Sequence, residues 1–365
     1  MRKKRHKVAA GSLLITVVIA LVLGLICSLL ILSGYHELRI RTDRDIETSL
    51  NRNLQSAVNM VLAGHPQTGV PQSSAMDLYG KGNDSVIITE GIWGVYDFAS
   101  VEARVEGRSR HRNLFFGPLP ADSLDGCLYL AEHQRSLSLV GNTRLTGKAY
   151  LPKGGIKPGY INQRGYDHSD LVNGPIWQST NTLPDVDIDR VRYYGDWLRR
   201  DSLAEQGQEL PDTIEHSFTD AVQTIHRKGP ITLSGVKYAG HIIIGSDSLI
   251  EVDSDVVLNG VLLIAPVVRF RRGFSGKVQA FGTDSIIVEE ACHMRYPSAL
   301  VIVKENKGKS QPRLVVGENS VVEGLVLTHA DDASVMTLME LRSGSLIRGI
   351  VYSNGFLSPE GGVYG

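Results

Sequence analysis

The chain has few cysteines and almost no net charge. Its 365 residues include three cysteines, Cys27, Cys127 and Cys292, which are too few for a disulfide framework or a zinc cluster. Cys127 and Cys292 would form a disulfide only if their segments met in the fold. The formal net charge of −1 lacks the basic excess of most nucleic-acid-binding proteins, so we expect no nucleic-acid partner.

The sequence also lacks the familiar catalytic and cofactor-binding motifs. It contains no Walker loop, dinucleotide-binding fingerprint, kinase motif set or HExxH zinc motif. We therefore expect no enzyme activity, no cofactor and no metal. The segment HADDA places Asp331 and Asp332 after His329. Neighbouring strand residues point to opposite faces, so a surface turn is the favoured interpretation and a catalytic carboxylate pair is the alternative.

A calcium loop is a weaker candidate in the segment DVDID. Asp185, Asp187 and Asp189 alternate as the first ligands of such a loop do. Arg190, however, occupies the position at which the loop requires glycine. A solvated acidic loop is therefore the favoured interpretation.

Apolar residues are abundant near the start of the chain. The basic leader MRKKRHK (residues 1–7) is followed by an uncharged segment, 8–34. Its central stretch Leu13–Leu32, as a helix, would span about 30 Å, the thickness of a bilayer core. Because basic residues stay on the cytoplasmic side, the pattern predicts a single-pass protein of the inner (cytoplasmic) membrane. The C-terminal domain would then be extracytoplasmic, and membrane lipid would be one partner.

The helix is predicted to continue beyond the membrane as an amphipathic stalk over residues 35–64. Ile46, Leu50, Leu54 and Val58 recur every four residues among polar side chains and form one apolar stripe. This stripe would either pack on the chain's own domain or act as an assembly seam for copies of the chain or other envelope proteins. A polar linker is expected at 65–84.

This N-terminal pattern resembles the first helix of type IV pilins and pseudopilins. The shared features are a basic leader, the pair Ala10-Gly11, and a hydrophobic helix that becomes amphipathic. The resemblance implies cleavage after Gly11 and a role in envelope assembly. That family has Glu at the fifth mature position, where this chain has Thr16; minor pilins of the atypical type are less strict about this residue.

A short phrase with a central glycine recurs through the rest of the chain. Gly235 and Gly260 are 25 residues apart, and Gly324 and Gly349 repeat that interval. Recurrence at this scale is typical of stacked coils that bury a shared core. We therefore predict a mainly β fold, a parallel β-helix (β-solenoid) ectodomain over 85–365, with an antiparallel sandwich as the alternative. The copies are LTGKAY, LSGVKY, LNGVLL, VEGLVL and IRGIVY, with structural glycines Gly147, Gly235, Gly260, Gly324 and Gly349. This texture is similar to bactofilins and related polymer-forming β-helix domains.

The repeat is interrupted at about 153–228 by a segment rich in glycine, proline and aromatic residues. Insertions that leave a stacked fold often make its specific contacts. The predicted binding residues are Tyr160, Tyr166, Trp177, Tyr193, Tyr194 and Trp197.

These features together predict a non-enzymatic structural or assembly component of the cell envelope. The alternative is a membrane-tethered carbohydrate-active or glycan-binding β-helix protein. An enzyme of that kind would have a groove lined by carboxylates and stacked aromatic residues, whereas a scaffold would have none.

Overall fold

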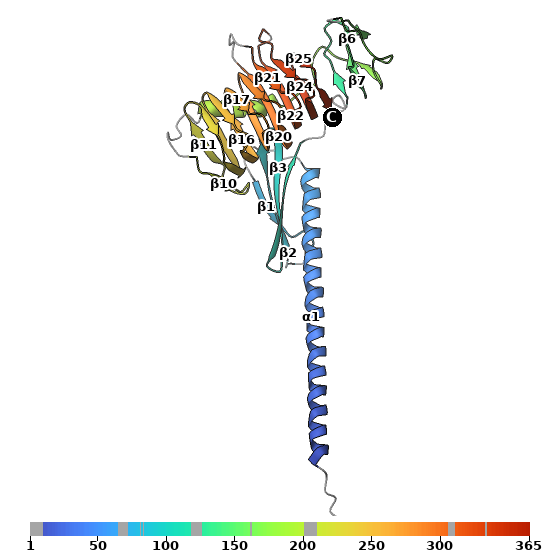
Figure 1. Ribbon diagram of the computed structural model, residues 1–365, viewed down its shortest axis with the longest axis vertical. Coiled ribbons are helices and arrows are strands. Elements are labelled where there is room, and N and C mark those ends of the chain that lie inside the picture. Colours follow the sequence, from blue (N-terminus) through green and yellow to red (C-terminus); the bar gives the residue numbers. More distant parts are fainter. Residues whose placement is uncertain are drawn as a thin grey trace, which may run out of the picture. The chain divides into compact units, whose positions relative to one another are not determined.

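The structure, a computed structural model, describes most of the chain in two compact units (Figure 1). The first unit combines the N-terminal helix with Gln72–Glu90 and Ala99–Leu114, and the second comprises Gly91–Phe98 and Phe115–Gly365. The described residues are 10–64, 72–80, 82, 84–117, 126–160, 163–200, 210–305, 311–332 and 334–365. The predicted leader, 1–7, lies outside them.

Helix α1 (Ala10–Ala63) is one continuous helix (Figure 1). No proline interrupts it, and the Gly64 N–H closes its last turn on the carbonyl oxygens of Met60 and Val61, at 3.1 and 3.2 Å. The apolar side chains of Leu13–Leu32 are exposed, because no other part of the described chain covers them. By length and composition this segment could cross a membrane, although a signal sequence passes the same test.

The other part of the first unit is a four-stranded sheet, in the order β1-β2-β3-β4. Strands β1 and β2 are antiparallel, and two-residue connections join β2 to β3 and β3 to β4, which only antiparallel neighbours permit. Residues 72–116 therefore differ from the parallel stack predicted to begin at residue 85. The strands are β1 (Gln72–Met76), β2 (Asp84–Trp93), β3 (Tyr96–Val105) and β4 (Arg108–Phe116). β1 lies in the predicted linker, whose residues 65–71 are outside the described part.

The apolar stripe of α1 is buried within this unit. All four predicted seam residues, Ile46, Leu50, Leu54 and Val58, are buried, so the chain itself covers them as in the first of the two interpretations.

Polar side chains beside the stripe form a row of contacts between α1 and β4. Arg110 donates to Glu47 at 2.7 Å, Arg108 pairs with Asp43, and Arg112 reaches Gln55. From Arg108 to Arg110 the partner on α1 moves by four residues, and four helical residues rise about 6 Å, close to the roughly 6.8 Å of two strand residues.

Two long parallel sheets dominate the second unit (Figure 1). The chain passes back and forth between a ten-stranded and a seven-stranded sheet. The ten-stranded sheet contains β10 (Thr213–His216), β11 (Gln223–Arg227), β13 (Lys237–Gly240), β14 (Ile242–Ser246), β16 (Val257–Ile264), β18 (Ser275–Gly282), β20 (His293–Lys304), β22 (Val321–Ala330), β24 (Leu346–Ser353) and β26 (Gly362–Tyr364). The seven-stranded sheet contains β12 (Ile231–Leu233), β15 (Leu249–Val252), β17 (Val267–Phe270), β19 (Ser285–Val288), β21 (Arg313–Val316), β23 (Leu338–Leu341) and β25 (Phe356–Pro359). Before β12 and again before β15, two consecutive strands belong to the ten-stranded sheet, where β10 pairs with β13 and β11 with β14. From β16 onward one strand of each sheet follows the other, and each strand pairs with the next strand of its own sheet. We call residues 213–364 the large parallel region.

The prediction of a mainly β chain with parallel stacking of the repeats is confirmed here. The repeated phrases in β22 and β24 pair in register, so that Gly324 lies beside Gly349. Both glycines have φ of +138°. A Cβ on Gly324 would lie 2.0 Å from the Ser298 carbonyl oxygen, and one on Gly349 would lie 2.0 Å from that of Gly324. Glycine is therefore required by both backbone conformation and space.

Alternation along the strands produces a core between the two sheets. In β16, Val261 and Leu263 belong to this core, whereas Leu262 and Ile264 belong to a second cluster on the opposite face of the ten-stranded sheet. The inner core also buries the rings of Phe270 and Phe274, whose centroids are 5.1 Å apart.

A small parallel region, residues 126–182, is separate from these sheets. It has a three-stranded sheet of β5 (Leu128–Tyr129), β7 (Ala149–Leu151) and β9 (Ile176–Gln178), and a two-stranded sheet of β6 (Leu137–Leu139) and β8 (Ile156–Pro158). Gly147, predicted as part of the single stack, belongs here because its neighbours are Cys127 and Gly174. The predicted interruption at 153 therefore falls inside a second parallel region.

Candidate functional site

The outward face of the ten-stranded sheet is the candidate site, because two other elements cover it. We call it the covered face. The covering elements are the hairpin tip, Gly91–Phe98, and helix α2 (Ile188–Arg200), which together bury an aromatic and aliphatic cluster. Sheet residues of that cluster are Ile243, Leu262, Ile264, Phe281, Ala299, Val301, Val303 and Leu327.

Gln279 binds the turn of the hairpin through both ends of its amide. Its side-chain oxygen accepts from the Val95 N–H, and its side-chain nitrogen donates to the Trp93 carbonyl, both at 2.9 Å. Gln279 is 2% exposed, so these two bonds satisfy groups that water does not reach. Gly94 has φ of +64°, and a Cβ there would collide with the Gln279 amide. The turn can therefore take this position only with glycine at residue 94 and with the Gln279 amide as its hydrogen-bond partner.

Three further bonds hold the hairpin tip, two of them to the covered face and one to α2. Trp93 Nε1 donates to the Gly260 carbonyl at 2.6 Å, and Tyr96 donates its hydroxyl proton to the Ser298 carbonyl at 3.0 Å. The Gly94 N–H donates to the Tyr194 hydroxyl of α2 at 2.9 Å. Burial raises the pKa of Tyr194 to about 12, so this hydroxyl stays neutral at physiological pH.

His241 is part of the aromatic cluster under the hairpin tip. Its ring centroid is 4.5 Å from that of Trp93 and 5.3 Å from that of Phe218. Its Nδ1 donates to the Asp220 carbonyl at 2.9 Å. Burial lowers the pKa of His241, so the ring is neutral and acts as an aromatic packing residue.

Helix α2 begins at a cap and packs one face on the sheet. Asp187 accepts from the Arg190 N–H at 3.1 Å, which is the bond of an N-terminal cap. Val191 and Tyr194, three residues apart, are both buried. Arg190 forms a 2.5 Å ion pair with Asp97 of the hairpin, and both side chains are largely shielded from water.

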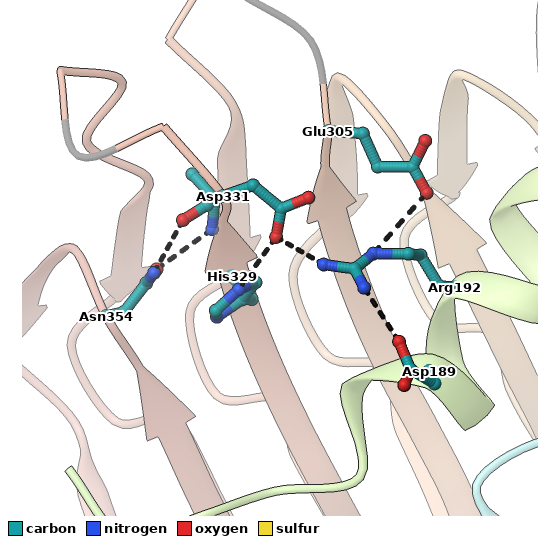
Figure 2. A network of polar contacts seen from close by, with 7 residues as sticks. Asp189, Arg192, Glu305, His329, Asp331 and Asn354 are labelled. Carbon is teal, nitrogen blue, oxygen red and sulfur yellow. Dashed lines mark hydrogen bonds and ion pairs between the residues drawn. The ribbon is translucent and has the colours of Figure 1, made fainter.

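Arg192 of α2 is the centre of a polar network at the end of β20 and β22 (Figure 2). It contacts Asp189 and Asp331 at 2.7 Å and Glu305 at 3.7 Å. His329 Nε2 lies 3.1 Å from the same Asp331 oxygen. The hydrogen bond and charge of Asp331 raise the pKa of Arg192, so the guanidinium remains charged and attracts all three carboxylates.

Asp331 and Asp332, the two carboxylates of the segment HADDA, bind different groups. Asp331 accepts from Arg192, whereas Asp332 accepts from the Ser334 N–H at 2.9 Å and its hydroxyl at 2.7 Å. Asn354 pairs with the backbone of Ala330 through both amide atoms, as Figure 2 shows. The two aspartates thus have different partners, and Asp331 fastens α2.

The aromatic residues predicted as contacts do not converge. Tyr160 and Trp177, 72% and 57% exposed, lie in the small parallel region. Tyr166 also lies there and donates to the Asp170 carbonyl at 2.7 Å. Tyr193 and Tyr194 lie on α2, as does Trp197, whose side chain is outside the described residues. Tyr194 is 5% exposed and packs on Phe281, so it is a packing residue instead of a surface contact.

The other sequence candidates also have definite positions. Asp187 caps α2 and Asp189 pairs with Arg192, so DVDID starts a helix. Cys127 and Cys292 are free. Within the described ranges, no group of three or more His, Cys, Asp or Glu residues is arranged to hold a metal ion.

Neither the hairpin tip nor Gln279, the residue of the covered face that binds it, was predicted from the sequence. The signal was present in GIWGVYDF, where aromatic residues flank a glycine turn, and in Gln279, a polar residue within an apolar strand. Pairing these two segments requires the fold, because 184 residues separate Val95 from Gln279.

No family model matches this chain, and neither the curated proteins nor the solved structures include a match. The resemblances to pilins and to bactofilins therefore rest on sequence pattern alone.

Proposed function

We propose that this chain is a single-pass, membrane-anchored structural component of a cell envelope. The apolar part of α1 would cross the inner membrane with the basic leader in the cytoplasm, so that both β regions are extracytoplasmic. Support comes from the continuous helix, whose apolar side chains at 13–32 are covered by no part of the described protein.

We further propose that the large parallel region is a β-solenoid. Its chain visits the two sheets in turn, and inward-facing residues of the seven-stranded sheet stack in register. The stacked set is Ile250, Val268, Ile286, Leu314 and Met339. Each coil contributes one or two strands to the ten-stranded sheet and one strand to the seven-stranded sheet, and it shares its core with neighbouring coils, as stacked repeats do.

The observation that carries a structural role is the way in which the hairpin tip is held. Its strands, β2 and β3, continue from residues that belong to the same compact unit as α1. The polar groups of Gln279 on the covered face and of Arg190 and Arg192 on α2 bind other parts of this chain. They hold the hairpin tip and α2 against the sheet, and this use within the chain supports a structural role.

Envelope partners or copies of the chain would have to use a surface other than the apolar stripe. Ile46 and Val58 are covered by the chain itself, whereas Leu38 and Ile40 of the same helix are exposed. We therefore place any assembly contact of α1 at or near the membrane surface, around residues 35–42.

Reporter fusions test the proposed topology. An alkaline phosphatase fused to the C-terminus should be active, because it would lie outside the cytoplasm, and a fluorescent reporter that folds only in the cytoplasm should be dark at the same position. The opposite pair of results would contradict the proposal. Deleting residues 13–32 should release the protein from the membrane fraction, and retention there would also contradict it.

A further inference from the structure

Three aromatic side chains form a row on the solvent-facing side of the small parallel region. Tyr129 of β5 pairs in register with Tyr150 of β7, which pairs in register with Trp177 of β9. We call these three residues the aromatic ladder. Ala149 and Leu151, which flank Tyr150, are fully buried, so alternation directs Tyr150 and its partners outward.

The ladder is exposed at Trp177 and half-buried at Tyr129 and Tyr150. The ring centroids of Tyr129 and Tyr150 are 5.3 Å apart with an interplanar angle of 31°. Trp177, on the edge strand, is 57% exposed. Tyr129 is held from behind, because its hydroxyl lies 2.8 Å from that of Thr180 and accepts from the Thr180 N–H at 3.1 Å. The row is therefore partly preorganised.

Packing in the core of the small parallel region does not explain why aromatic residues occupy the three positions of the ladder. The core of the small parallel region is formed by Leu139, Ala149 and Leu151 on the other side of the strands. A large apolar ring that remains in water contributes little to folding, and rows of exposed aromatic residues usually mark a binding surface.

The charge around the ladder favours an anionic ligand. Residues 126–182 include six Lys and Arg residues against three Asp and Glu residues. Lys148 lies two residues before Tyr150 on the same strand face, and its Nζ is 5.8 Å from the Tyr150 ring centroid. Among the acidic residues, Glu132 already accepts backbone N–H groups from Gln134 and Lys153.

We propose that the aromatic ladder is a binding site for an acidic polysaccharide. The C–H groups on the face of a sugar ring carry partial positive charge and contact the negative face of an aromatic ring. Successive rings of the ladder would hold successive sugars, and Lys148 would meet their carboxylates. Single-stranded nucleic acid also stacks on aromatic residues and is anionic, so it serves as the competing ligand in the test.

The test measures binding of the full chain in detergent micelles to polygalacturonate, an acidic polysaccharide. Dextran serves as the neutral polysaccharide and poly(dT) as the nucleic acid. Trp177→Ala should weaken polygalacturonate binding about tenfold, by analogy with the loss of one stacking surface for a base. Lys148→Gln should weaken it less and should reduce its dependence on salt.

Tyr160→Ala provides the matched control. Tyr160 is an exposed aromatic residue of the same region but lies outside the ladder, so its removal should leave binding unchanged. Equal affinity of the Trp177→Ala and unchanged chains would overturn the proposal, as would binding of poly(dT) without polygalacturonate. Equal affinity for dextran would overturn its anionic part. The circular dichroism spectrum of each variant should match that of the unchanged chain, and the Lys148→Gln result stands even if Trp177→Ala fails to fold.

Discussion

The two parallel regions use aromatic residues in opposite ways. On the large parallel region, Phe281 and the hairpin-tip residue Trp93 are buried in the cluster that joins the hairpin tip and α2 to the sheet. In the small parallel region, Tyr150 is half-buried and Trp177 is exposed, and the two pair in register on the outer face. Similar side chains on similar strands thus have different consequences. In one region aromatic residues hold layers together, and in the other we propose that they form a ligand site.

The regions also differ in how much apolar core supports each strand. The large region stacks strands of both sheets around one continuous cluster, whereas the small region has strands of two or three residues and few buried side chains. Free energy from burial therefore concentrates in the large region, at about 25 cal/mol per Å² of apolar surface removed from water. Substitutions that disturb its stacking should have the largest effects.

Substitution of Gly324 should have the largest effect. Gly324→Ala places a Cβ 2.0 Å from the Ser298 carbonyl oxygen at a φ of +138°, so both strands must move. We expect a loss of about 5 kcal/mol or more in the free energy of unfolding, at the upper end for single substitutions. Chemical denaturation followed by circular dichroism measures it.

Gly235→Ala is the control for this glycine effect. Gly235 also has a positive φ, +67°, but its added Cβ would meet nothing closer than 3.9 Å. It should cost about 1 kcal/mol, the conformational penalty alone. Equal losses for the two variants would contradict the close stacking of β20, β22 and β24.

Removal of Trp93 should have the next largest effect. Trp93→Ala deletes a buried ring that contacts Phe218 and His241 and also removes the bond to the Gly260 carbonyl. We expect a loss of about 4 kcal/mol in the free energy of unfolding, as for large-to-small substitutions in a core. Circular dichroism is the appropriate probe, because the variant lacks one of the tryptophans. A loss comparable to that of an exposed residue would remove the contrast between the two regions.

The sequence contained enough information for the local pattern of the fold. Periodicity indicated the long helix, and the spacing of Gly324 and Gly349 indicated strands that stack in register, because both are properties of neighbouring residues. It did not reveal that Gly147 belongs to a separate region, since the phrase around it resembles the others and only its pairing with β5 and β9 distinguishes it.

The candidate site was less accessible to sequence reasoning for a physical reason. The hairpin tip and Gln279 recognise each other through backbone groups of the turn, which carry no residue-specific signal. Arg190 and Asp97 likewise appear in the sequence as ordinary charged residues, and their ion pair exists only because α2 and the hairpin meet on one sheet face.

Gln279→Leu tests the hairpin attachment without changing side-chain size much. It leaves the Val95 N–H and the Trp93 carbonyl without their partner in a buried place. We expect a loss of about 2–3 kcal/mol, the cost of unpaired buried polar groups. Limited proteolysis near residues 91–98 should also become faster. Gln178→Leu, on an exposed strand of the small region, is the matched control and should change neither measurement.

A smaller effect is expected from pH through His241. Burial lowers its pKa in the folded chain. The nearby His216 lowers this pKa further, whereas Asp220 raises it. Below the ordinary histidine pKa of about 6.5, the unfolded chain binds a proton here that the folded chain does not, so the free energy of unfolding should fall as pH decreases from that value. Above a pH of about 6.5, His241 makes its full contribution to the free energy of unfolding.

Denaturation of the His241→Gln variant measures this contribution. The change in unfolding free energy between pH values about one unit above and one unit below 6.5 should be smaller in this variant than in the unchanged chain. The exposed residue His133, replaced by Gln, should leave the change unaltered. Identical pH dependence in all three proteins would contradict a neutral, buried His241.

The smallest effect on stability is expected where we propose the ligand site. Trp177→Ala removes a ring as large as that of Trp93, but the Trp177 side chain is 57% exposed and lies on an edge strand. Its free energy of unfolding should change by no more than about 0.5 kcal/mol, as for other surface substitutions. A loss near that of Trp93→Ala would mean that the ladder serves to stabilise the small region. A negligible loss together with impaired polygalacturonate binding would separate the two uses of aromatic residues, because the same substitution would then affect recognition and leave folding intact.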